Sequence, residues 1–344
     1  MSERKMKVGI VGAGRIAQTY AQVFAASDIA KVVGVADARR DAARAMAETL
    51  NCESFESHEA MAAAVQPEAT VICTPPVTHP ELCLFFLERG VHVLCEKPLA
   101  IDSASAREML AAADRNGVKL TMASKFRYVD DVIRARSILL SGILGDLVLY
   151  ESSFTAHVDM SGRWNSDPAV SGGGVLIDNG THSLDMFRYL VGPLTEIQVI
   201  EGKRSQGLAV EETVHIFVRS TQGVMGSIDL SWTIQKDLDN YINIYGSHGT
   251  VSVGWKQSKY RQAGSRDWVV FGQGYNKLEA FQSQVNNFLR GIRGEEPLLI
   301  DSEDVLASVE AMEAGYRALQ QSQWTRLGSL NVNAPAKDLT AVLA

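Results

Sequence analysis

The feature that most constrains the fold is a glycine-rich turn, GAGRIA at residues 12–17, which directly follows a short apolar segment. The segment that leads into the turn, KVGIVG, is typical of a buried β-strand. The segment that leads out of it, RIAQTYAQVFAAS, is typical of an amphipathic helix. Gly12 permits a tight turn, Gly14 lets a ligand approach the backbone, and Ala17 lets the helix pack closely on the strand. The turn therefore predicts a pyrophosphate site at the helix N-terminus, formed by Gly12, Gly14, Arg15 and Ile16.

The alternation of apolar strand-like and helical segments continues through the first 123 residues. Nearly continuous apolar strands of this kind indicate a parallel sheet that is buried on both faces. We predict an α/β Rossmann dinucleotide-binding domain at residues 1–123.

Asp37 ends the second strand-like segment, KVVGVAD. An acid at this place accepts hydrogen bonds from the adenosine ribose, and its charge repels a 2′-phosphate. The sequence therefore predicts NAD as the cofactor ahead of NADP. Arg39 and Arg40 keep NADP open as the alternative, because a nearby arginine accommodates that phosphate, although both also fit a solvated helix start.

The pattern changes after residue 123 to consecutive strand-like segments, which run from residue 195 to 272 and are separated by Gly, Asn and Asp turns. Short connections of this kind predict a mainly antiparallel sheet. We expect an α+β substrate-binding and oligomerisation domain at residues 124–330, with a C-terminal helix that can pack back on the first domain.

Composition narrows the functional classes. A net charge of −7 without a basic block argues against nucleic-acid binding, and no apolar run approaches the length of a membrane span. We expect a cytoplasmic protein. The four cysteines and seven histidines show no metal-site spacing, so no metal is predicted.

The stretch GGGVLIDNGTHSLD, residues 172–185, places a glycine run before Asp178, His182 and Asp185. These three side chains are four and then three residues apart, which at helical spacing puts them on one face. A solvated helix face is the plain alternative for such a pattern.

Together with TPPVTHPEL (residues 74–82), CEKP (95–98) and SKFRY (124–128), these motifs resemble the Gfo/Idh/MocA oxidoreductases over most of the chain. The resemblance implies a second domain with a large open sheet that also makes the oligomer contact, as a homodimer or homotetramer. It implies an activity as a dehydrogenase or reductase of a sugar, cyclitol or nucleotide sugar. The catalytic residues that it implies are Lys97, Asp178 and His182, and the further cofactor contacts are Thr74, Pro75, His79 and Glu96.

On the substrate side, Tyr275 and Glu279 resemble a YxxxE segment that closes over the substrate, whereas Lys125 and Val129 depart from the family pattern. Both departures leave the substrate-side chemistry open. Aromatic and planar donor side chains suit polyols, which suggests four more contacts, although packing at a domain interface explains them equally well. They are Arg127, His157, Trp164 and Trp232.

Oxidation of a secondary alcohol needs a base for the hydroxyl proton, and a neutral His182 can serve as that base. Asp178 can orient the ring or hold a neighbouring hydroxyl, and Lys97 can stabilise a developing alkoxide. We expect Asp185 to support His182, and the glycines to let the backbone pass close to a bulky substrate. Two alternatives stay open: an NAD-retaining glycosidase of the same fold and a non-catalytic nucleotide-binding sensor.

Overall fold

A computed structural model describes residues 4–327, and the predicted second domain, which runs to residue 330, ends just outside them. The chain divides into two compact units. The first comprises Met1–Lys125 and Leu278–Leu306, and the second comprises Phe126–Lys277 and Ala307–Ala344. The helix around residues 277–293 therefore belongs mainly to the first unit, although it follows the strands of the second in the sequence.

The first unit is built on a six-stranded sheet with the order β3-β2-β1-β4-β5-β6, in which every neighbouring pair is parallel. This order is that of a Rossmann domain, with β1 and β4 in the middle. The strands are β1 (Met6–Val11), β2 (Ala30–Ala36), β3 (Glu53–Phe55), β4 (Ala69–Ile72), β5 (His92–Glu96) and β6 (Leu120–Ala123).

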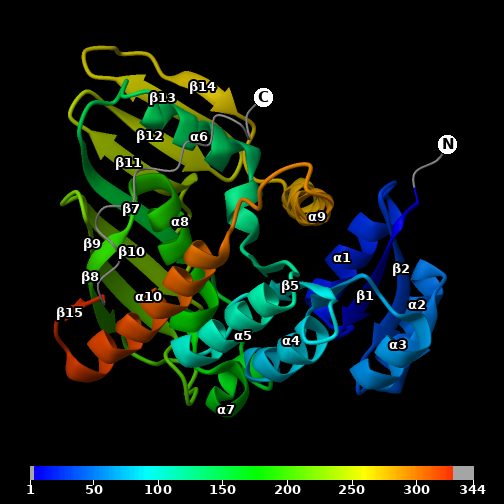
Figure 1. The fold of residues 1–344 in the computed structure, drawn as a ribbon. Helices are drawn as coiled ribbons and strands as arrows, with labels where there is room; N and C mark the ends of the chain where they lie inside the picture. The colour runs from blue at the N-terminus through cyan, green and yellow to red at the C-terminus, as the bar shows by residue number, and fades with distance from the viewer. Residues whose placement is uncertain (1–3, 328–344) are drawn as a thin grey trace. The chain divides into compact units, whose positions relative to one another are not determined.

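Helices cover both faces of this sheet, as the apolar strands require (Figure 1). On one face α1, α2 and α9 pack on the sheet in a single apolar core. On the other face lie α3, whose Met61 reaches Gly9 and Gly34 of the sheet, and α4, whose Phe85 and Phe86 contact His58 of α3. The helices are α1 (Arg15–Ala25), α2 (Arg40–Leu50), α3 (His58–Val65), η1 (Pro76–Thr78), α4 (His79–Leu87), α5 (Ser103–Arg115) and α9 (Lys277–Arg293).

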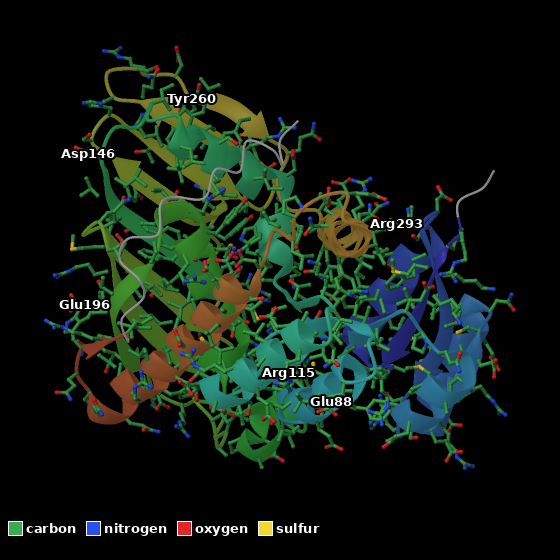
Figure 2. All side chains as sticks on the ribbon, viewed as in Figure 1. Glu88, Arg115, Asp146, Glu196, Tyr260 and Arg293 are labelled. Atoms are coloured by element: carbon green, nitrogen blue, oxygen red, sulfur yellow. The ribbon has the colours of Figure 1, made fainter. Side chains whose placement is uncertain are left out.

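The ends of these helices are polar. Glu88 directly follows α4 and Arg115 ends α5, and both are exposed (Figure 2). The N-terminus of α5 is capped by Asp102, whose carboxylate accepts from Ser105 N at 2.7 Å.

The second unit is built on a nine-stranded sheet with the order β14-β13-β12-β11-β7-β10-β9-β8-β15. All neighbours are antiparallel except β7 and β10, which run parallel, so the sheet is mixed and mainly antiparallel. The strands are β7 (Leu147–Thr155), β8 (Leu194–Glu201), β9 (Thr213–Ser220), β10 (Met225–Ser231), β11 (Asn240–Gly246), β12 (Gly249–Gly254), β13 (Ser258–Gln262), β14 (Val269–Gly272) and β15 (Thr325–Arg326).

The central strand β7 is absent from the set of strands that the sequence pattern predicts. Its middle residues, Glu151, Ser152 and Ser153, interrupt the apolar alternation. The strand is nevertheless held on both sides, by β10 and by β11. Pairing with distant segments therefore decides its conformation, and local propensity does not.

The two faces of this sheet differ. The inner face packs on the helices α8 and α10 (Figure 1). Tyr150 of β7 meets Phe187 of α8 edge to face, and Gly315 of α10 lies against Ile197 and Val199 of β8. The helical segments of this part of the chain are η2 (Lys125–Tyr128), α6 (Asp130–Leu140), η3 (Trp164–Ser166), α7 (Pro168–Ser171), η4 (Leu176–Gly180), α8 (Thr181–Val191) and α10 (Ser302–Gln321). The opposite, outer face carries polar and apolar side chains, among them Glu196 (Figure 2), which forms an ion pair with Arg219.

A buried ion pair ties η2 to α8 within the second unit. The guanidinium of Arg127 donates to both carboxylate oxygens of Asp185, with distances of 2.9 and 2.6 Å. Arg127 is 2% exposed and Asp185 is fully buried. Two buried charges in this fork geometry satisfy each other, and removing one of them leaves the other uncompensated in a low dielectric.

We therefore expect Arg127→Met to lower the free energy of unfolding by about 3 kcal/mol or more, because Asp185 loses its counter-charge. Arg134→Met is the matched control, since Arg134 forms an exposed ion pair with Asp130, and its effect should stay below about 0.5 kcal/mol. Urea unfolding followed by tryptophan fluorescence measures both variants. Equal, small effects would contradict the structural role of the buried pair.

Candidate active site

The glycine turn of the first unit has the geometry that a dinucleotide needs. Gly12 has a φ of 92°, and a Cβ at this residue would lie 2.7 Å from the carbonyl oxygen of Cys73. Around Gly14 no atom lies within 4 Å of a Cβ position, so the backbone is open to a ligand there. The helix α1 begins without a side-chain cap, and its first N–H groups are therefore available to a phosphate. Arg15 is exposed and Ile16 half-buried at this helix start.

Asp37 directly follows β2 and holds the turn. Its Oδ2 accepts from Ala13 N at 2.7 Å, and its Oδ1 accepts from Arg39 N at 2.8 Å. The carboxylate is thus fixed beside the glycine turn by two backbone hydrogen bonds. An acid therefore lies beside the glycine turn, where the sequence predicts one, and this arrangement of residues fits NAD as the ligand.

The turn after β4 is shaped by His79, which is fully buried. Its Nδ1 lies 2.8 Å from Pro98 O and its Nε2 lies 2.9 Å from Thr74 O. Burial lowers the pKa of His79, whereas the neighbouring carbonyl groups raise it. His79 therefore holds the turn that carries the half-buried Thr74 and Pro75, and its ring is fully enclosed by protein.

Glu96 and Lys97 end β5, and the Lys97–Pro98 peptide bond is cis. Glu96 is buried and accepts from the hydroxyl of Tyr20 at 2.8 Å, and Gln284 of α9 donates to the same hydroxyl at 3.0 Å. Burial raises the pKa of Glu96, while the charges of Lys97 and Lys125 oppose that shift. Lys97 is half-buried, so its ammonium stands at the margin of this buried network.

In the second unit, Asp178 lies in the π-helical turn η4, which leads directly into α8 and His182. The sequence predicted one continuous helical face, but the wider turn changes the angular spacing of the side chains before residue 181. Asp178 is half-buried, and His182 is 6% exposed. Asp185 accepts from the guanidinium of Arg127, and a supporting role of Asp185 toward His182 stays a prediction. We call residues 173–180 the Asp178 turn.

The glycines in the Asp178 turn are required by packing inside the second unit. A Cβ on Gly173 would collide with the hydroxyl of Tyr316, and one on Gly174 would collide with the backbone of Glu211. The structure therefore gives Gly173 and Gly174 a packing role, and the expectation that the glycines let the backbone pass close to a substrate stays a prediction. Protein atoms already fill the space that side chains would need.

His182 contacts an aromatic cluster through Phe126. Phe126 contacts the His182 ring edge to face at a centroid distance of 5.0 Å, and Tyr275 stacks on Phe126 at 5.2 Å. Tyr241 and Trp255 complete the cluster. Burial raises the pKa of Tyr275 to about 12, so its hydroxyl stays a hydrogen-bond donor at neutral pH. The sequence named His182 and Tyr275 but missed Phe126, whose only local signal was its place in SKFRY.

Two of the remaining predicted substrate contacts are buried in the protein and two are exposed. Arg127 is enclosed and paired with Asp185, so the prediction of a sugar contact gives way to a structural role. Trp232 is 3% exposed, and its indole is likewise part of the protein interior. His157 and Trp164 are exposed in the segment that follows β7.

Among residues 4–327, no three His, Cys, Asp or Glu side chains gather in a way that could hold a metal ion. Across the same residues, none of the helices has the length and apolar character that a membrane crossing needs.

Comparison with known proteins places this geometry in a family. Residues 6–124 match the oxidoreductase family with an NAD-binding Rossmann fold, and residues 132–252 match the GFO/IDH/MocA C-terminal domain. Inositol 2-dehydrogenase of Rhizobium meliloti is 25% identical over 92% of this chain and 98% of its own. Trans-1,2-dihydrobenzene-1,2-diol dehydrogenase of Sus scrofa is 30% identical over 72% of this chain and 74% of its own.

The fold has solved counterparts. A levoglucosan dehydrogenase, in a complex with NADH and levoglucosan, superposes with a TM-score of 0.87 at 18% identity, covering 95% of this chain and all of that one. The two family matches, the Rossmann sheet order and the glycine turn agree with one another. The chain belongs to the Gfo/Idh/MocA family of oxidoreductases, and its first unit is the NAD-binding Rossmann domain of that family.

Proposed function

We propose that this protein transfers a hydride between NAD and a secondary hydroxyl or carbonyl group of a sugar, cyclitol or nucleotide sugar. The observation that carries the proposal is the Asp178 turn, which presents a half-buried carboxylate one turn before His182 in a chain of this family. Relatives named for inositol, glucoside and apiose oxidation support a polyhydroxylated substrate.

Each residue has a distinct role in the proposal. Bound NAD supplies the hydride acceptor. His182 takes the hydroxyl proton at a ring nitrogen, because a neutral imidazole is an effective base near neutral pH. Asp178 orients a neighbouring hydroxyl or the imidazole, and the ammonium of Lys97 stabilises negative charge on the reacting oxygen. Tyr275, His157 and Trp164 are proposed substrate contacts, since each is at least partly accessible.

An anaerobic screen of polyols, aldoses and nucleotide sugars for NADH absorbance tests the activity. NADH formation with one of these classes is the expected result. Cleavage of a glycoside with full retention of NAD would support the glycosidase alternative. Tight NAD binding without any turnover would support the sensor, which has no need of an acid–base pair.

The roles of His182 and Lys97 separate in a pH series. His182→Ala should lose the acidic limb of the oxidation rate and be partly rescued at high pH, because hydroxide or buffer can replace a lost base. Lys97→Met should lose on the order of a hundredfold in kcat at every pH, since nothing diffusible replaces a fixed charge. NAD affinity is measured alongside and should change far less. If high pH rescues the lysine variant and leaves the histidine variant unchanged, the roles are exchanged.

Cofactor preference is proposed to favour NAD through Asp37. Asp37→Ala should weaken NAD binding and lower the ratio of NAD to NADP affinity by about tenfold or more, about 1.4 kcal/mol. Part of the loss of NAD affinity comes from the glycine turn, because the Ala13 N–H loses its acceptor in this variant. Asp41→Ala, a change at an exposed acid in the first turn of α2, is the control and should leave the ratio unchanged. A native protein that already binds NADP tenfold more tightly than NAD would contradict this assignment.

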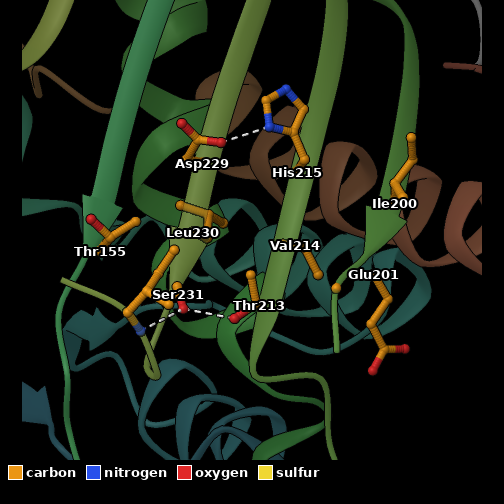
Figure 3. A pocket seen from close by; sticks show the side chains of 11 residues that line it. Thr155, Ile200, Glu201, Thr213, Val214, His215, Asp229, Leu230 and Ser231 are labelled. Atoms are coloured by element: carbon orange, nitrogen blue, oxygen red, sulfur yellow. Dashed lines mark hydrogen bonds and ion pairs between the residues drawn. The ribbon is translucent and has the colours of Figure 1, made fainter. Parts of the chain in front are cut away.

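We further propose that the outer face of the nine-stranded sheet binds a second copy of the chain, as a homodimer or within a homotetramer. Ile200, Phe217 and Met225 are exposed by 51, 38 and 51% on neighbouring strands, a large share for apolar side chains. A pocket lined by residues of the strands β7, β8, β9 and β10 lies at the same place. In it, Nδ1 of His215 is 2.6 Å from Oδ1 of Asp229 (Figure 3). An alternating polar and apolar face of this kind is suited to self-association around a two-fold axis.

Light scattering at micromolar concentration checks the assembly. Native protein should scatter as a dimer or tetramer, and Phe217→Lys should shift it toward monomer, because a charge is placed on the proposed contact. Leu140→Lys is the control, since Leu140 is 62% exposed at the end of α6. A native monomer, or the same shift in both variants, would contradict this interface.

A further inference from the structure

Two consecutive buried carboxylates stand directly before β9, and the proposed reaction does not use either of them. Glu211 is 5% exposed and Glu212 is fully buried. Neither one forms an ion pair among the described residues, and both instead accept hydrogen bonds from backbone N–H groups. A buried carboxylate is costly unless such donors compensate for its lost hydration. Each one therefore fixes the backbone that supplies its donors.

Glu211 binds the start of the Asp178 turn. Its Oε1 accepts from Gly174 N at 2.8 Å and from Leu176 N at 3.1 Å, and its own backbone oxygen accepts from Val175 N at 2.9 Å. Three successive N–H groups of the turn thus end on one residue. Gly174 O in turn accepts from Asp178 N at 3.0 Å, which links the anchored segment to the proposed catalytic carboxylate.

Tyr316 of α10 completes this anchor. Its hydroxyl donates to Glu211 Oε1 at 2.8 Å and occupies the space that a side chain on Gly173 would need. Burial and the charge of Glu211 raise the pKa of Tyr316, so the hydroxyl remains a donor. The glycines, Glu211 and Tyr316 therefore form one packed unit.

Glu212 binds a different segment. Its carboxylate accepts from Ser205 N at 2.7 Å, from Gln206 N at 2.9 Å and from Leu208 N at 3.2 Å. Burial raises the pKa of Glu212, but the three N–H donors and the charge of Arg204 together outweigh burial and lower the pKa overall. The loop at residues 205–208 is therefore wrapped around a charged group.

Gln206 of this loop is hydrogen-bonded to the segment that follows β7. Its side-chain amide donates to Val158 O at 3.0 Å and to Trp232 O at 3.1 Å, and its side-chain oxygen accepts from Met160 N at 3.0 Å. Residues 158–160 directly follow His157, a proposed substrate contact. Glu212 thereby determines the conformation of this segment through the loop that it holds.

We propose that Glu211 and Glu212 are positioning residues with separate effects: Glu211 holds the Asp178 turn, and Glu212 holds the loop that orders residues 158–160, next to His157. The inference rests on the proposed function, because it assigns the two carboxylates to chemistry and to substrate binding respectively. Loss of Glu211 should therefore lower kcat, and loss of Glu212 should raise KM. A role in general stability alone predicts no such division.

The experiment compares the matched variants Glu211→Gln and Glu212→Gln, which have the same shape but lack the charge. Glu211→Gln should lower kcat by about tenfold with little change in KM, and Glu212→Gln should raise KM by about tenfold with little change in kcat, each because of one weakened charged hydrogen-bond set. Glu211→Ala should lower kcat more than Glu211→Gln does, since the glutamine side chain can still accept hydrogen bonds from the turn. Tyr316→Phe, which removes one donor only, should lower kcat less than either and keeps the test open if an alanine variant fails to fold.

Amide hydrogen exchange supplies a readout that does not depend on activity. Exchange should speed up at residues 174–178 in the Glu211 variant and at residues 158–160 and 205–208 in the Glu212 variant. If both variants change kcat and KM alike, or if exchange at these segments stays native, the division of roles is wrong. If the native protein oxidises no substrate, the proposed function fails, and the exchange pattern alone then decides whether the two carboxylates hold these segments.

Discussion

The second unit depends on the close approach of a bare backbone to Glu211 and Tyr316. Because no Cβ fits at Gly173 and Gly174, the chain can lie against these residues only with glycine there. Glycine costs conformational entropy on folding, and the hydrogen bonds of residues 174–176 offset that cost. The position of the turn then determines where Asp178 and His182 lie. Phe126, on which Tyr275 stacks, contacts the His182 ring.

The same principle recurs in the first unit, where polar side chains in or beside the predicted cofactor motifs hold backbone in place. Asp37 holds Ala13 N, and His79 spans the carbonyl groups of Thr74 and Pro98. Glu96 accepts from Lys97 N at 3.3 Å and also from the hydroxyl of Tyr20. Groups that are fixed by a supporting shell can meet a ligand without rearrangement, which is the advantage of a preorganised site. Motif residues in this chain thus include scaffolding as well as direct contacts.

The sequence predicted the first unit well because its signals are local. The glycine turn, the apolar strands and Asp37 all lie within about one βαβ repeat of one another, and their spacing alone indicates the fold. In the second unit the deciding contacts are distant in sequence. Strand β7 lies between β10 and β11, and Phe126 meets Tyr241 and Tyr275. No periodicity within a short window carries such contacts, and so the strand and the cluster were missed.

The buried glutamates show two ways to keep an acid inside a protein, with opposite consequences for pH. Burial raises the pKa of Glu96, so its charged form costs free energy once the pH exceeds the ordinary glutamate pKa. Backbone N–H groups lower the pKa of Glu212, so its contribution to stability is present above that value and is lost as the pH falls. Acid therefore weakens the loop at residues 205–208 while it relieves the cost of Glu96. The first carboxylate lies beside Lys97, whose charge compensates it in part. The second is stabilised mainly by backbone N–H donors, with a smaller contribution from the charge of Arg204. Fixed backbone donors give a carboxylate a defined geometry, and geometry is what a positioning residue has to provide.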